Sequence, residues 1–245
     1  MRTYEINPAG VTDIGNVRPT NEDHLLATGD LFVVADGMGG QGRGEAASRL
    51  ATETLQVGFE SDPTGDGLLA AVGRANSAVI NRADTDPELQ GMGTTIAAVA
   101  AVVEQGQQKL AVVNVGDSRV YLLRAGSLER LSSDHSVVAD LVRAGEISEA
   151  EAFSHPERHR LTQALGVEPV VEPFVAYSIP VAGDRLLLCS DGLFNELTAE
   201  QITGVLTSVG DPAEAASALV SLAKDHGGSD NITTMVLDIA ELDIG

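Results

Sequence analysis

The stretch that decides the fold is LFVVADGMGG, residues 31–40. Its first five residues are apolar and partly β-branched, so they predict a short strand that is buried on both faces. Asp36 ends this strand, and Gly37 is expected to let the backbone turn so that its carbonyl can also bind a metal. Magnesium and manganese prefer oxygen ligands, usually a few carboxylates and water. A carboxylate at such a strand end therefore indicates a site for a hard cation.

Two distant segments repeat the arrangement, LCSDG at 188–192 and GGSDN at 227–231. A lone Asp-Gly pair is most often a simple turn. Because Asp36, Asp191 and Asp230 all follow this pattern, we expect them to bind metal together. Two cations a few ångströms apart activate water and clamp a phosphoryl group. The three segments therefore predict a hydrolase of phosphate esters.

A fourth acidic segment lies upstream, at Glu22 and Asp23, with Arg18 before it. Neighbouring residues of an extended segment point to opposite faces, so the two acids are not expected to bind one ion directly. We expect one to orient metal-bound water and the other to brace the site through a hydrogen bond. Arg18 offers a planar fork of donors that suits phosphate oxygens.

Composition narrows the class of protein. The 245 residues are enough for one large domain, and 43% apolar residues predict a packed core. Since aromatic residues make up only 3% and tryptophan is absent, Ala, Val, Leu and Ile must form that core. The net charge of −21 argues against a nucleic-acid partner, and it favours a solubilising surface over an acidic docking face.

The single cysteine and the five histidines indicate neither a disulfide nor a zinc site. Cys189 lies in an apolar run and is expected to be a buried small hydrophobe without an activating base. The histidines lack zinc-like spacing. With neither a signal-peptide pattern nor a membrane-length apolar run, we expect a cytoplasmic monomer with no membrane segment; a membrane-anchored longer parent is also compatible.

The order of periodic segments predicts an α+β protein. Helices are expected at 44–59, 68–83, 136–144, 148–153, 198–208 and 212–225. Strands are expected at 31–35, 94–103, 109–115, 119–124, 127–131, 175–179, 185–190 and 232–239, with a hairpin turn at Ala125-Gly126. Thr198 and Asp211 are expected to cap the last two helices. The polar, proline-containing stretch from His155 to Pro173 predicts a mobile flap.

Six segments in order resemble the signature of the metal-dependent serine/threonine protein phosphatases, the PPM family, in its bacterial branch. They are RPTNED (18–23), ADGMGG (35–40), GMGTT (91–95), NVGDSR (114–119), SDG (190–192) and SDNIT (229–233). The resemblance implies a four-layer α-β-β-α sandwich, with two stacked, mainly antiparallel sheets flanked by helix pairs. It also implies one domain over residues 1–245 with a flap subdomain at about 133–173.

The resemblance assigns roles to individual residues. It implies metal ligands at Asp36, Gly37, Asp191 and Asp230, two Mn²⁺ or Mg²⁺ ions, and phosphate binding by Arg18. At the position of Asp117 bacterial relatives help to hold a third metal near the flap, together with the residue at the Asp191 position. Asn231 is expected either to donate to neighbouring carboxylates or to serve only as a turn former.

The chain departs from the family pattern where a general acid has been proposed. Animal relatives carry histidine where this chain has Met38, and many bacterial members carry histidine where it has Gln41. The proton donor for the leaving alkoxide is therefore open between a metal-bound water and His159, which lies in the expected flap and is otherwise an ordinary solvated histidine.

The function expected from the residues and the resemblance is hydrolysis of phosphoserine and phosphothreonine esters in proteins, counteracting protein kinases. Bound water between two metals would attack phosphorus, with Asp36 bridging the ions and Arg18 holding the phosphate oxygens. Two alternatives fit the same sequence: a phosphatase of a sigma-factor regulatory switch, and a non-catalytic pseudo-phosphatase that senses phosphorylated partners. Loss of a metal-binding aspartate would mark the second alternative, and all are present.

Overall fold

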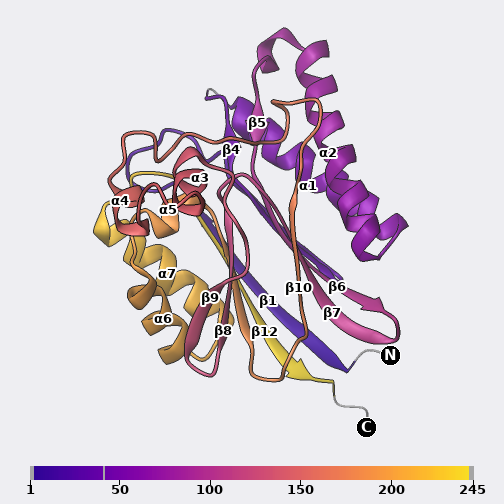
Figure 1. Ribbon diagram of the computed structural model, residues 1–245, viewed down its shortest axis with the longest axis vertical. Helices are drawn as coiled ribbons and strands as arrows, with labels where there is room; N and C mark the ends of the chain where they lie inside the picture. Colours follow the sequence, from indigo (N-terminus) through magenta and orange to yellow (C-terminus); the bar gives the residue numbers. More distant parts are fainter. Residues whose placement is uncertain (1–2, 41, 243–245) are drawn as a thin grey trace.

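A computed structural model describes residues 3–40 and 42–242 of the chain. Two five-stranded sheets stack face to face, and a helix pair covers the outer face of each sheet (Figure 1). We call them sheet A, with strand order β1-β12-β11-β8-β9, and sheet B, with order β10-β7-β6-β3-β2. All pairings within both sheets are antiparallel. The predicted four-layer α+β sandwich is therefore confirmed.

The elements have the following bounds. Sheet A holds β1 (Tyr4–Asp13), β8 (Arg119–Arg124), β9 (Ser127–Arg130), β11 (Arg185–Cys189) and β12 (Ile232–Glu241). Sheet B holds β2 (His24–Thr28), β3 (Leu31–Ala35), β6 (Ile96–Glu104), β7 (Gln107–Val115) and β10 (Phe174–Ser178), and a small ribbon pairs β4 (Gly37–Met38) with β5 (Gly93–Thr94). The helices are α1 (Arg43–Ser61), α2 (Gly65–Thr85), the 3₁₀ turn η1 (Pro87–Leu89), α3 (Val137–Arg143), α4 (Glu149–Phe153), α5 (Asp191–Phe194), α6 (Ala199–Ser208) and α7 (Pro212–His226).

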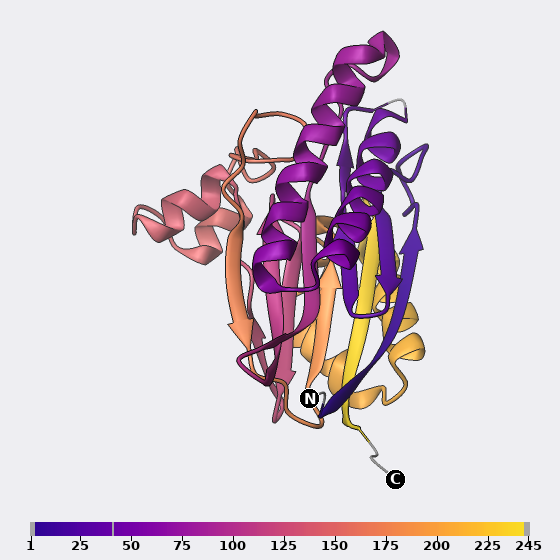
Figure 2. The same cartoon turned by 90° about the vertical axis from the view of Figure 1, so that its right-hand side faces the viewer.

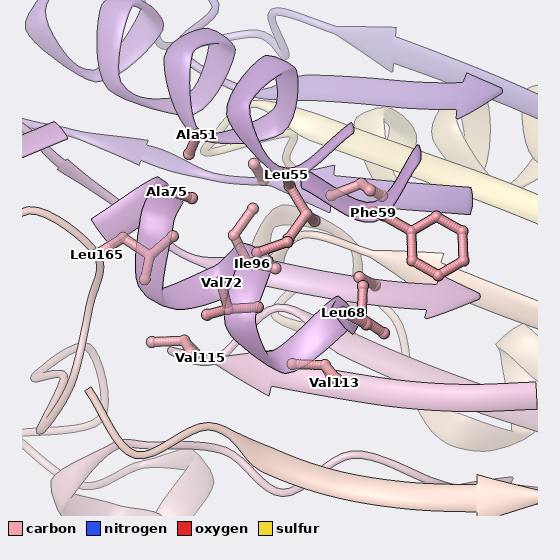
Figure 3. Close-up of a cluster of buried hydrophobic side chains, with 14 of the residues drawn as sticks. Ala51, Leu55, Phe59, Leu68, Val72, Ala75, Ile96, Val113, Val115 and Leu165 are labelled. Atoms are coloured by element: carbon pink, nitrogen blue, oxygen red, sulfur yellow. The ribbon is translucent and has the colours of Figure 1, made fainter. Parts of the chain in front are cut away.

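Three apolar layers hold the four structural layers together. One lies between the sheets, one between sheet A and helices α6 and α7, and one between sheet B and helices α1 and α2. Figure 3 shows the last of these, where Leu55, Leu68 and Val72 of the helices meet Val113 of the sheet. Small residues at the helix faces, such as Ala51 and Ala75, let the helices approach the strands closely.

Local sequence signals fix the ends of several helices. The hydroxyl of Thr198 accepts from the N–H of Gln201, which reaches back to form a capping box. Asp211 accepts from the N–H groups of Ala213 and Glu214, just before Pro212 opens α7. Both predicted caps are therefore confirmed, as is the Ala125-Gly126 turn, whose two residues have φ of 50° and 81°.

The sequence patterns did not predict two strands near the start of the chain, nor a break within a later strand. Strand β1 contains Pro8 and Gly10, which weaken a strand pattern but are tolerated at the sheet edge where β1 lies. Strand β2 lies at the corresponding edge of sheet B. The strand expected at 94–103 is divided at Thr95. Its N–H donates to the carbonyl of Asp36, and its hydroxyl accepts from the N–H of Asp36.

Antiparallel pairing brings distant segments to one end of the sandwich. In sheet B the end of β7 pairs with the start of β6, and β6 pairs with β3 near Ala35. In sheet A the end of β11 pairs with the starts of β8 and β12. The loops that leave this end therefore meet although they are far apart in sequence.

Residues 133–163 project from the sandwich as a helical hairpin of α3 and α4 (Figure 2). A bridge between Ser136 and Leu161 closes its base. Beyond it, Leu165 is fully buried and pairs with Thr94, while Asn76 of α2 accepts from the N–H of Gly166. The stretch expected to be a flap up to Pro173 is therefore attached to the body over its second half, since these polar and apolar contacts hold it there. In the described part of the chain no helix is both long and apolar enough to cross a membrane.

Helix α1 and the ribbon strand β4 touch through two glycines. A Cβ at Gly44 would lie 2.6 Å from the carbonyl oxygen of Gly37, and a Cβ at Gly37 would lie 2.1 Å from the carbonyl oxygen of Gly44. Backbone atoms on both sides leave no room to relax.

We expect Gly44→Ala to lower the free energy of unfolding by about 1–3 kcal/mol, because the added methyl group overpacks this contact. Gly73→Ala is the matched control, since Gly73 lies in α2 with no described atom within 4 Å of the new Cβ. It should raise the free energy of unfolding by about 0.5–1 kcal/mol. Urea denaturation of the three proteins measures both effects, and wild-type stability of Gly44→Ala would show that the contact is loose.

Candidate functional site

Four aspartates lie at the end of the sandwich where the strand ends converge. Asp36 follows β3, Asp117 lies between β7 and β8, Asp191 opens α5 after β11, and Asp230 comes just before β12. The expectation that each acid follows a strand is wrong for Asp230, which precedes one. It reaches the same place because β12 runs antiparallel to β11.

The backbone of Asp36 is fixed by two threonines of the GMGTT segment. Its N–H donates to the hydroxyl of Thr95 at 2.9 Å, and its carbonyl accepts from the N–H of Thr95 and from the hydroxyl of Thr94. The Thr95 hydroxyl also bonds the Ser118 hydroxyl at 2.7 Å, beside Asp117. Neutral hydroxyl groups therefore join two acidic loops without neutralising them.

Gly37 is needed for close approach rather than for a special turn. Its φ does not lie in the left-handed region, so the predicted reason for glycine is wrong. The residue is buried, and a side chain there would meet backbone oxygens of both Gly44 and Glu22. Only glycine lets β4, α1 and the Glu22 segment share this space.

Glu22 and Asp23 have separate partners, as expected for neighbours in an extended segment. Glu22 accepts from the N–H groups of Gly42 and Gly44, each at 3.1 Å, and so caps the start of α1. Asp23 is buried and accepts from the hydroxyls of Ser190 and Thr233, each at 2.7 Å. Both acids thus fix elements that carry the aspartates.

Asn231 pins the loop that carries Arg18. Its side-chain N–H groups donate to the carbonyls of Ile14 and Thr20, and its oxygen accepts from the N–H of Glu22. The expectation that it donates to neighbouring carboxylates is therefore wrong, because backbone carbonyls of the loop use both of its donors. The alternative, that Asn231 serves only as a turn former, is also incomplete, because its side chain holds the loop of Arg18 in place.

Arg18 joins the acidic group by an ion pair. Its guanidinium lies 2.6 Å from Oδ2 of Asp230, and half of the arginine side chain is exposed. The bond to Asp230 raises the pKa of Arg18, with further contributions from the charges of Asp191 and Asp36. Arg18 therefore lies within the field of at least three of the acids while remaining open to solvent.

Burial and mutual repulsion shift the titration of the acids. The pKa of Asp36 is raised well above its ordinary value by burial and then by Asp23 and Asp191. The pKa of Asp117 is raised in the same way by burial and by Asp191. Burial also raises the pKa of Asp23 to about 7, against the lowering effect of its two hydroxyl partners. The single positive charge of Arg18 therefore does not balance the negative charge of these acids.

The donor set fits hard cations. Asp23 Oδ1 and Asp191 Oδ1 are buried oxygens without a hydrogen-bond partner among the described residues. As placed, the described side chains form no group of three or more His, Cys, Asp or Glu that could hold a metal ion. Instead Asp230 turns to Arg18, and Asp191 accepts from Asn195. Mg²⁺ keeps several waters and needs only one or two carboxylates per ion, so sparse protein ligands suit it.

The three positions considered for a general acid lie differently. His159 is exposed on the projecting hairpin and lines a cavity of about 200 Å³ together with Asp117 and Asp191. Burial and the charge of Asp230 raise the pKa of Asp191 above its ordinary value, and His159 offsets part of this rise. Met38 is half-buried in β4. Gln41 lies outside the described residues.

Four hydroxyl residues support the acids and were not singled out from the sequence: Thr95, Ser118, Ser190 and Thr233. Each lies inside one of the six motif segments, next to or near an aspartate or glycine. Their position in the motifs was the available signal. Their role needed the fold, because each bonds a segment distant in sequence.

Comparison with known proteins gives consistent matches. The protein phosphatase 2C family matches residues 20–224. Serine/threonine protein phosphatase PstP of Mycobacterium tuberculosis is 41% identical over 247 residues, which cover 99% of this chain. That alignment covers 47% of the relative, so the chain spans about half of its length.

Two solved structures superpose closely. The PPM Ser-Thr phosphatase MsPP from Mycobacterium smegmatis, in complex with cacodylate, gives a TM-score of 0.87 at 47% identity and covers 95% of this chain and 97% of its own. The catalytic domain of PstP, in complex with two manganese ions, gives a TM-score of 0.86 at 39% identity and covers 97% of this chain and 100% of its own.

The Asp23 carboxyl should make stability depend on pH. Its pKa of about 7 in the folded protein exceeds its ordinary value of 3.8, so the folded state keeps a proton that the unfolded chain loses. Stability therefore falls as pH rises from about 4 to about 7. In chelator, Asp23→Asn should therefore stabilise the protein more at pH 8 than at pH 5, by roughly 1–3 kcal/mol.

Urea denaturation at both pH values tests this. An amide keeps an oxygen for Ser190 and Thr233 and removes the negative charge. Asp84→Asn, at an exposed position of α2, is the control and should change stability equally at the two pH values. A gain for Asp23→Asn that is the same at pH 5 and pH 8 would show that Asp23 is not the titrating group.

Proposed function

We propose, since the chain belongs to the protein phosphatase 2C family, that it hydrolyses phosphoserine and phosphothreonine esters in proteins with the help of divalent metal ions. The observation that carries the proposal is the convergence of Asp36, Asp191 and Asp230 from three strand ends beside the solvent-open guanidinium of Arg18. This reaction requires negative charge to bind the cations. It also requires a group such as a guanidinium that donates hydrogen bonds to the phosphate.

The acids are assigned to cations by their placement. Asp36, the carbonyl of Gly37, Asp191 and Asp230 are the proposed residues that would hold two Mn²⁺ or Mg²⁺ ions. The oxygens of Asp117 and Asp191 that face the cavity are proposed to hold a third. When bound, the ions supply positive charge for the phosphate and lower the pKa of a water molecule.

Arg18 is proposed to bind the phosphate oxygens of the substrate. In the structure its partner is the carboxylate of Asp230, which carries one negative charge. Bound cations would attract the same carboxylate. A phosphate dianion offers the guanidinium two oxygens in a matching plane, so exchange of partners is favourable. Glu22, Asp23 and Asn231 keep the loop of Arg18 and the start of α1 in place through the bonds described above.

The leaving serine or threonine alkoxide requires a proton. His159 is the proposed donor, because it lines the same cavity as Asp117 and Asp191 and lies close enough to contribute to the pKa of Asp191. An imidazolium in this position donates to the departing oxygen as general acid. Positioning on the projecting hairpin makes this donor specific to substrates that contact the hairpin.

A catalytic role is favoured over a purely phosphate-sensing module, because every aspartate of the acidic group is present. The proposed substrates are proteins phosphorylated by serine/threonine kinases. Because these kinases act where ATP is available, the proposed location is the cytoplasm. The proposed state of the protein is a monomer. A domain of residues 1–245 with a flap at about 133–173 is consistent with the projecting hairpin in Figure 2.

Activity should depend on added metal and on the three aspartates. Chelator-treated protein should not hydrolyse an aryl phosphate, and Mn²⁺ should restore turnover. Asp36→Asn should lower kcat by about a hundredfold or more with the fold intact, because an amide carries no charge for the cations. Glu53→Gln on α1 is the control and should be fully active. Full turnover in metal-free buffer, or a normal kcat for Asp36→Asn, would remove the two-metal proposal.

Substitution of Arg18 should weaken phosphate binding more than the chemical step. Arg18→Ala should raise KM for an aryl phosphate and the inhibition constant of inorganic phosphate by about tenfold, the loss of a charge-assisted hydrogen bond. Arg18→Lys should recover only part, since an ammonium lacks the planar fork. The control is Arg82→Ala, another half-exposed arginine with one carboxylate partner, at 3.0 Å. Equal constants for wild type and both Arg18 variants would place Arg18 outside the phosphate site.

A further inference from the structure

Helices α3 and α4 contain apolar residues that the fold does not bury. Both helices lie entirely in the described part of the chain, and neither has a buried residue. Phe153 at the end of α4 is 65% exposed. Local caps hold the pair instead: the Ser136 hydroxyl starts α3, and a capping box of Ser148 and Glu151 starts α4. The hairpin therefore presents apolar surface without using it for its own stability.

Part of this surface lines a cavity. Val138, Val142 and Phe153 of the hairpin line a space of about 200 Å³, and Phe194 of α5 lines it from the body. Pockets for small-molecule ligands usually hold about 300–1,000 Å³, whereas one water takes only about 30 Å³. The cavity therefore suits one large side chain and is too small for a separate cofactor.

The cavity is continuous with the proposed catalytic site. Asp117 and Asp191 form part of its wall, as does His159. A group that fills it while a phosphate lies at the acids can belong to the same molecule as that phosphate. In a phosphoprotein, that group is a side chain a few residues from the phosphorylated one.

The charges at the cavity favour an apolar occupant over an acidic one. Arg119 holds the buried carboxylate of Asp134 through contacts of 2.7–3.2 Å, and Arg130 shares the same carboxylate at 3.4 Å. Arg143 is paired with Asp140. These three arginines therefore share two carboxylates, and Asp117 and Asp191 add negative charge to the same wall, which opposes an acidic occupant.

Arg158 and Glu149, which have opposite charges, also line the cavity. The Arg119 guanidinium lies 3.6 Å from the centre of the Phe194 ring and holds that ring in the cavity wall. An aromatic wall of fixed position suits an apolar side chain.

We propose that this cavity is a specificity subsite that binds one bulky apolar side chain near the phosphorylated residue of a protein substrate. The inference rests on the proposed phosphatase function. Binding would cover the exposed Phe153 and the half-buried Val142 and would order the hairpin against α5.

The test compares phosphothreonine peptides that carry Ser, Leu, Phe or Glu at each of the three positions on either side. Each kcat/KM is divided by that of the same protein on an aryl phosphate, which has no side chain to place in the cavity. We expect at least one position where Leu or Phe exceeds Ser by about tenfold. Phe153→Ser and Val142→Ser should reduce that ratio to near one.

Val57→Ser is the matched control. Val57 on α1 is 68% exposed, close to the exposure of Phe153, and does not line the cavity. This variant should keep the preference. Since α3 and α4 have no buried residue, the two cavity variants should unfold at the wild-type temperature, which circular dichroism checks.

Three outcomes overturn the subsite: no preference for Leu or Phe at any position, a preference for Glu, or an unchanged preference in both cavity variants. Failure of the protein to hydrolyse the aryl phosphate and every peptide in the presence of Mn²⁺ would instead overturn the proposed function, and the subsite with it. Hydrolysis of the aryl phosphate together with a flat peptide profile would reject the subsite alone.

Discussion

The carboxylates of Asp36, Asp117 and Asp191 repel one another at the end of the sandwich, and the rest of the structure holds them there. Burial raises the pKa of each, with a further rise from Asp23 and Asp191 at Asp36, from Asp191 at Asp117 and from Asp230 at Asp191. Without bound cations this arrangement opposes folding. Three apolar layers stabilise the sheets that carry the acids, so the unfavourable charge is confined to the loops at one end.

The kind of partner given to each aspartate separates structural acids from those of the site. Asp134, Asp184 and Asp238 are each held by two or more contacts to an arginine. Asp23 and the backbone of Asp36 instead meet hydroxyl groups, which orient them and leave the negative charge in place. An arginine in those positions would neutralise the attraction for cations. Arg18 is the exception, and its half-exposed side chain can exchange partners.

The sequence predicted much of this arrangement and failed at definable points. Strand β3, the helix pairs and the caps at Thr198 and Asp211 follow from local periodicity and turn chemistry, which need no knowledge of the fold. The edge strand β1 was missed because it contains Pro8 and Gly10, which weaken a strand pattern but are tolerated at a sheet edge.

The acids of the site could be named from their motifs, but several of their interactions could not. Gly37 looked like a turn residue, yet its reason is contact with Gly44, which is visible only after α1 packs on β4. Asn231 and the hydroxyl of Thr233 bond segments more than 200 positions away in sequence. Local patterns carry no information on such partners. The projecting hairpin shows the reverse case: its two short helices were expected from the sequence, and local caps rather than buried packing fix where they begin. A segment held by caps and by polar contacts at its base can change position without exposing core, whereas α1 cannot, since its movement would displace Gly37 and the Glu22 cap together. The fold thus keeps the acids on its least movable elements and leaves the surface that meets the substrate on its most movable one.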